Sequence, residues 1–178
     1  MRAILSTRML LASFAALAFW LPATIASAAA YAKFEGVDGE SSDQHHRGWC
    51  EILSFSQRIQ AADGSKGDSR RPRRASFEDI KIERRIDKAS PKLEEAAAKG
   101  EVFPKVTLHL TSANGKRVYY VVELRNALIT SYGFNGTGDS VPTEEVALSF
   151  KEIKVTYTEY DSTGKSKGNV EFSYKIGK

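Results

Sequence analysis

The strongest constraint on the fold is a period of two in the apolar residues of the second half of the chain. It runs through residues 102–110 and 118–124, on either side of the dipeptide Asn114-Gly115. Successive side chains of a strand point to opposite faces, so each run predicts a strand with one apolar face. Because Asn-Gly tolerates the positive φ angles of a tight turn, the two runs predict a β-hairpin.

The end of the chain repeats the pattern. Apolar residues occupy even positions over 146–150 and odd positions over 153–157. This change of phase predicts a β-bulge near Lys151-Glu152, since without an extra residue the apolar side would turn outward. A polar turn over 161–168 and a final alternating run over 170–176 predict a second hairpin.

The first half of the chain has weaker strand signals and one helix signal. Residues 31–37, 49–58 and 76–86 predict strands, and the Gly-, Ser-, Pro- and charge-rich residues 61–74 predict a solvated loop. Ser90 as the N-cap, Pro91 at the first position and Gly100 as the terminator predict one short helix. These elements predict a mainly β fold, an antiparallel β-barrel or sandwich with one short α-helix.

The first 30 residues have the order of a secretory signal peptide. Arg2 and Arg8 flank the start, residues 9–21 are apolar apart from Ser13, and Ala26-Ser27-Ala28 offers the small-x-small pattern that signal peptidase recognises. A membrane-spanning helix needs about 20 apolar residues, which this run does not reach. We therefore expect export to a secreted or periplasmic location, with cleavage after Ala28 or Ala30 and no membrane attachment afterwards.

The remaining 148 residues (178 − 30), numbered 31–178, are the size of one domain. The signal segment contains 2 of the 26 basic residues and no acidic one, so 24 basic residues face 22 acidic ones, a net charge of +2. This nearly neutral charge argues against a nucleic-acid partner, because proteins that bind nucleic acids usually have a strongly basic surface. Cys50, the only cysteine, has no internal disulfide partner, and we expect a buried structural thiol rather than a link between two copies.

The search for chemistry finds few candidates. Asp43, His45, His46 and Cys50 are ligand types for zinc or copper, but adjacent histidines on an extended segment point apart, so we expect solvated loop histidines. A Cys50–His46 nucleophile pair has no orienting carboxylate marked in the sequence. His109 lies on the polar side of its strand, where we expect a surface residue. We therefore predict no catalytic, cofactor-binding or metal-binding residue, and no enzymatic activity.

The sequence leaves more than one interpretation open for two further stretches. The segment 70–74 (Arg-Arg-Pro-Arg-Arg) fits a flexible basic loop, and the alternatives are an acidic-partner patch, a nucleic-acid contact or a protease-sensitive loop. Asn135-Gly136-Thr137 matches a glycosylation acceptor, although its Gly- and Asn-rich surroundings favour turn chemistry.

Several stretches of residues 31–178 together resemble the haemolysin-coregulated protein family, Hcp, the tube component of type VI secretion. The resemblance is most specific in residues 85–93 (RIDKASPKL), which are similar to the passage that leads into the single helix of that family. Residues 33–41 (KFEGVDGES) resemble its opening strand and turn. Residues 46–56, 123–131 and 146–153 also fit.

The resemblance implies a β-barrel with one attached helix, and six copies closing into a homohexameric ring. It also implies rings that stack into a hollow tube able to carry small effectors, with a sheath and a spike protein as partners. Family tubes assemble in the cytoplasm without an export signal, so the N-terminal segment is a departure. The alternative is an exported monomeric binding or effector module that does not assemble.

Overall fold

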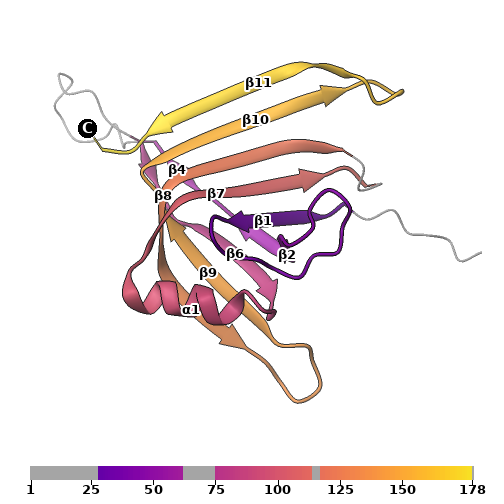
Figure 1. The fold of residues 1–178 in the computed structure, drawn as a ribbon. Helices are drawn as coiled ribbons and strands as arrows, with labels where there is room; N and C mark the ends of the chain where they lie inside the picture. The colour runs from indigo at the N-terminus through magenta and orange to yellow at the C-terminus, as the bar shows by residue number, and fades with distance from the viewer. Residues whose placement is uncertain (1–27, 62–74, 114–116, 178) are drawn as a thin grey trace, which may run out of the picture.

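The computed structural model describes residues 28–61, 75–113 and 117–177. They form an antiparallel β-fold with one helix (Figure 1). The elements are β1 (Ala30–Phe34), β2 (Cys50–Ile52), β3 (Ser54–Ser56), β4 (Ile59–Gln60), β5 (Ser76–Phe77), β6 (Ile80–Arg85), α1 (Ser90–Lys99), β7 (Val102–Thr111), β8 (Val118–Asn135), β9 (Thr143–Ser149), β10 (Glu152–Tyr160) and β11 (Ser166–Lys175).

The main sheet almost closes on itself. Its hydrogen-bonded order is β2-β1-β7-β8-β9-β6-β3, and the strands at the two ends of this order are consecutive in the chain, separated only by Leu53. The Leu53 N–H donates to the Glu83 carbonyl at 2.8 Å, so this segment leaves β1 and joins β6. The mainly β, one-helix prediction is confirmed, although the ladder itself is open between β2 and β3. None of the helices in the described residues is long and apolar enough to cross a membrane.

The long strand β8 organises the sheet. One edge pairs with β7, while the other pairs with β10 along its first half and with β9 along its second half. The predicted change of phase occurs between β9 and β10, but the predicted bulge is wrong. Two residues separate the pairs Arg125↔Glu152 and Leu128↔Ser149 on each strand, so no extra residue is inserted. β8 changes phase at the same point, where Asn126 has a φ of 49°.

The helix begins at Ser90, one residue before the predicted first position, Pro91, and it has a different cap. Ala89 is the N-cap, and the Ser90 hydroxyl accepts a hydrogen bond from the Asp87 N–H at 3.0 Å instead of capping the helix. Gly100 ends the helix at a φ of 65°, as expected for a left-handed C-cap. Leu93 and Ala96 are buried, so this face attaches the helix to the barrel.

The described strands confirm both hairpins: β7 pairs with β8, and β10 pairs with β11. The tip of the first hairpin, Asn114-Gly115, lies outside the described residues. So do residues 1–27 of the predicted signal segment and the basic segment 70–74.

Candidate assembly surface

The apolar face of the sheet runs from the core onto a hairpin that the rest of the subunit does not cover. Directly paired residues of neighbouring strands share a face. Three rows of paired residues therefore cross β1, β7, β8, β10 and β11: Phe34–Val106–Leu124–Ile153–Tyr174, Ala32–Leu108–Val122–Val155–Phe172 and Ala30–Leu110–Tyr120–Tyr157–Val170.

On the β10–β11 hairpin, burial decreases from the first row to the third, toward the tip of the hairpin. Ile153 is fully buried, Phe172 is 45% exposed and Val170 is 72% exposed, although all three lie on the same face. We call the exposed residues Tyr157, Val170 and Phe172 the hairpin apolar strip. Figure 1 shows the hairpin projecting beyond the rest of the sheet.

The other face of the hairpin is charged. On that face Lys154 pairs with Glu171 at 3.0 Å and Lys175 with Glu152 at 3.6 Å, joining the two strands. Lys167 and Glu159 form a third pair at 2.6 Å near the tip, where the register of the two strands shifts next to Glu159. Among the described strands β11 pairs only with β10, so its outer edge offers backbone donors and acceptors to another chain. The hairpin thus combines an apolar face with an open edge, which is typical of an association surface.

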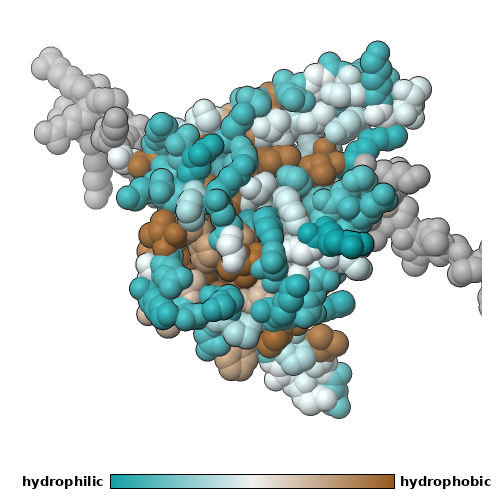
Figure 2. Space-filling view, viewed as in Figure 1, coloured by the Kyte–Doolittle hydropathy of each residue, from teal (hydrophilic) through white to brown (hydrophobic). Residues whose placement is uncertain are grey.

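Other exposed apolar side chains lie elsewhere on the subunit. Leu53 and Phe55, at the junction of β2 and β3, are 50% and 40% exposed, and we call them the junction pair. Phe134 and Val141, in and after β8, are 63% and 66% exposed. Figure 2 shows apolar side chains interrupting the hydrophilic surface beside the lower projection, where β8 leads into β9.

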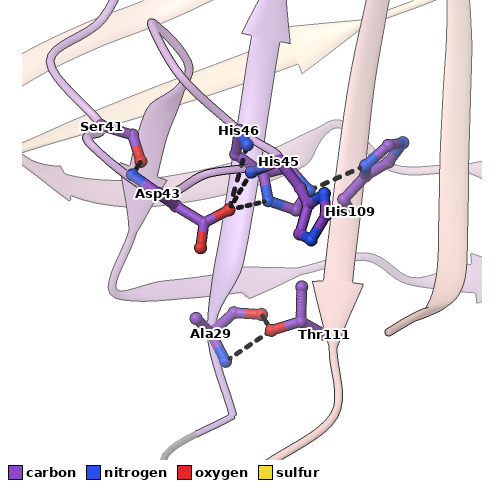
Figure 3. A network of polar contacts seen from close by, with 7 residues as sticks. All are labelled: Ala29, Ser41, Asp43, His45, His46, His109 and Thr111. Carbon is purple, nitrogen blue, oxygen red and sulfur yellow. Dashed lines mark hydrogen bonds and ion pairs between the residues drawn. The ribbon is translucent and has the colours of Figure 1, made fainter. Parts of the chain in front are cut away.

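Two of the histidines that the sequence singled out, His46 and His109, meet in a polar cluster (Figure 3). His46 is 1% exposed. Its Nδ1 lies 2.7 Å from Asp43 Oδ1, and its Nε2 lies 3.1 Å from Nδ1 of His109 on β7. The ring of Tyr31 stacks on His46 at 4.1 Å. The expected solvated position is thus wrong for His46 and right for the exposed His45.

The hydrogen bonds of this cluster join the loop before β2 to strand β7. The two facing ring nitrogens of His46 and His109 bond each other, and no group of three metal-binding side chains occurs among the described residues. Burial, followed by the nearby His46, lowers the pKa of His109 to about 4. Partial burial opposes the shift, but hydrogen bonds from His46 and His45 hold the pKa of Asp43 below its ordinary value. The cluster therefore attaches the loop before β2 to β7.

Cys50 is a structural thiol, as expected. It is 1% exposed on β2, and burial raises its pKa to about 12. The nucleophile pair with His46 is not formed, since both ring nitrogens of His46 are engaged by Asp43 and His109. A thiol with this pKa carries no appreciable thiolate at neutral pH.

The sequence reading missed a second buried polar group. Arg84 on β6 is fully buried and bonds Glu144 of β9 at 2.5 Å, together with Asp87 before the helix. The Tyr132 hydroxyl donates to the other Glu144 oxygen at 2.7 Å. In the sequence, Arg84 lies between Ile82 and Ile86 at the alternating positions that are otherwise apolar. This position on the apolar face could have indicated that Arg84 is buried. The network joins the approach to α1 with β6, β8 and β9.

The glycosylation motif lies at the exposed end of β8. The Thr137 N–H donates to the Ser140 hydroxyl at 3.4 Å, and the two hydroxyl oxygens lie 3.0 Å apart. These contacts are typical of a turn, which the Gly- and Asn-rich sequence around the motif predicts.

Comparison with known proteins identifies the fold. The family model described as "Type VI secretion system effector, Hcp" matches residues 31–157, well over half of the chain. The chain belongs to the Hcp family. Hcp1 of Pseudomonas aeruginosa strain PAO1 is 27% identical over 151 residues, which cover 82% of this chain and 93% of that protein.

Solved Hcp structures agree with the family assignment. Hcp1 from Salmonella typhimurium superposes with a TM-score of 0.71 and 26% identity, covering 84% of this chain and 95% of that one. A structure described as a type six secretion system protein gives a TM-score of 0.74 and 29% identity, covering 83% and 95%. The chain is therefore an Hcp-family protein of the type VI secretion system, and the β-barrel-with-helix expectation is confirmed at the level of the fold.

Proposed function

We propose that this Hcp-family chain is an exported structural subunit that closes into hexameric rings, which stack into a hollow tube. The observation that carries the proposal is the hairpin apolar strip. Burying Tyr157, Val170 and Phe172 against a second copy would extend two of the three apolar rows into the neighbouring subunit. Apolar burial contributes about 25 cal/mol per Å2, so a strip of this size stabilises a subunit contact appreciably.

A ring needs two different surfaces on each subunit, because a head-to-tail contact must close after a fixed rotation. The hairpin apolar strip with the open edge of β11 supplies one surface. The junction pair, Leu53 and Phe55, supplies the other, since it lies at the junction of β2 and β3, two strands that do not pair with the hairpin. We assign these two surfaces to each other across the subunit boundary.

The role is structural rather than enzymatic. Within the described residues, the two buried polar groups, around His46 and around Arg84, bond to the subunit itself and leave no nucleophile near a free base. Small effectors inside the ring, and spike and sheath proteins at its ends, are the partners that the family implies. Export through the N-terminal segment would place the assembly in the periplasm or outside the cell.

The test is the mass in solution of residues 29–178, measured by light scattering at low and moderate salt. A mass of about six protomers supports the ring. A monomer at every concentration would overturn it and favour the alternative, an exported Hcp-like binding or effector module. The ion pairs Lys154–Glu171 and Lys175–Glu152 lie on the face of the hairpin away from the strip, so we expect salt to change the mass little.

A further inference from the structure

Ala29, just before β1, is held by Thr111 at the end of β7 (Figure 3). The Ala29 N–H donates to the Thr111 hydroxyl oxygen at 3.2 Å. The Ala29 carbonyl accepts from the Thr111 N–H at 2.9 Å and from the Thr111 hydroxyl at 3.1 Å. Thr111 is only 1% exposed, and the two residues are 82 positions apart. We call these three hydrogen bonds the Ala29 clasp.

The next residue, Ala30, is paired with two neighbouring strands. Ala30 pairs with Ile52 of β2 on one edge and with Leu110 of β7 on the other. Ala28 is exposed. Together with Leu53 and Phe55, residues 28–30 line a shallow cavity of about 280 Å3. Hydrogen bonds to β7 therefore extend one residue before β1, to Ala29.

The sequence offers signal peptidase two equivalent motifs, one ending at Ala28 and one ending at Ala30. Cleavage after Ala30 would remove the clasp and the Ala30 pairing. It would also put a charged ammonium on Tyr31, which is 7% exposed and stacked on His46. Burying an unpaired charge is costly. Cleavage after Ala28 instead puts the ammonium on the half-buried Ala29, where one hydrogen is donated to Thr111.

We propose that the processing site is the Ala28–Ala29 peptide bond and that Thr111 receives the new N-terminus. Signal peptidase hydrolyses this bond: water gives its hydroxyl to the Ala28 carbonyl carbon and a proton to the Ala29 nitrogen. Once β1 has formed, the Ala30–Tyr31 bond lies inside a strand paired on both edges, so only the outer bond remains accessible. The inference rests on the proposed export of the chain.

The first test expresses all 178 residues in a bacterial host, recovers the exported fraction and measures its intact mass. A single species beginning at Ala29 is the expected result. A species beginning at Tyr31, alone or in a mixture, would overturn the proposed site. A chain that keeps Met1 would overturn export itself, whereas light scattering on residues 29–178 would still decide the ring separately.

The second test examines the clasp without any protease. Chains beginning at Ala29 and at Tyr31 are released from a cleavable fusion, each with and without Thr111→Val. We expect the equilibrium constant for unfolding to be about tenfold smaller for the longer chain, since net hydrogen bonds are individually modest. Thr111→Val removes the two hydroxyl hydrogen bonds and should reduce this difference, whereas Thr107→Val on the same strand should preserve it. Equal stability of the two unsubstituted chains would contradict the clasp.

Discussion

Two positions on strand β10 have apolar side chains on the same face but opposite environments. Ile153 and Tyr157 lie on one face of one strand, yet Ile153 is fully buried and Tyr157 is 44% exposed. The rest of the barrel covers Ile153. Tyr157 is uncovered because the hairpin extends beyond the barrel. An alternating pattern therefore identifies an apolar face but does not reveal whether the same subunit covers it. In this protein the uncovered part is the surface that we propose for association.

The largest expected contrast is between a buried and an exposed carboxylate. Glu144→Ala leaves Arg84 with one of its two carboxylate partners, so we expect a loss of about 3–5 kcal/mol in the free energy of unfolding. Glu171→Ala removes a surface pair with Lys154 and should cost about 0–0.5 kcal/mol. Urea unfolding measures both. Similar losses for the two variants would show that the Arg84 network does not join the helix approach to the sheet.

A second contrast uses apolar side chains from the rows themselves. Leu124→Ala creates a cavity beside Val106 and Ile153 and should cost about 3 kcal/mol. Phe172→Ala, on the exposed hairpin, should change the stability of the isolated subunit by about 0.5 kcal/mol or less. Urea unfolding under conditions that keep the subunit monomeric gives both values. A large loss for Phe172→Ala would mean that the hairpin is part of the core of the subunit.

The smallest expected effect is a pH dependence of stability from the histidine cluster. The pKa of His109 is lowered to about 4, so the unfolded chain takes up this proton near pH 6.5 while the folded chain stays neutral. Stability is therefore full above pH 6.5 and falls as the pH drops toward 4. We expect about 1–2 kcal/mol over this range, given that His109 is only half-buried. His46, Glu123, Lys105 and Trp49 face the ring.

The matched variants for this effect are His109→Gln and His45→Gln. His109→Gln removes the titrating ring and should flatten the stability profile between pH 6.5 and 4. His45 is exposed, so His45→Gln should preserve the profile. Thermal unfolding at several pH values gives the comparison, and an unchanged slope in His109→Gln would assign the dependence to other groups.

Local patterns predicted most of the fold, because strand alternation, turn residues and the Gly100 cap act over a few residues. They failed where the partner lies far along the chain. The burial of His46 depends on His109, 63 residues away, and that of Arg84 on Glu144, 60 residues away. The bulge prediction failed for the same reason: β8 changes phase opposite the β9–β10 junction, and one strand read alone does not show this.

The central claim is that the hairpin apolar strip joins one copy to the next, and a pair of charge substitutions tests it most directly. Val170→Asp places a charge on the strip, whereas Ser173→Asp places the same charge on the polar face of the same strand, beside Lys154. Light scattering on residues 29–178 gives the mass of each variant. The account predicts a monomer for Val170→Asp and an unchanged assembly for Ser173→Asp. An intact assembly in Val170→Asp, or a monomer for the unsubstituted chain, would contradict it.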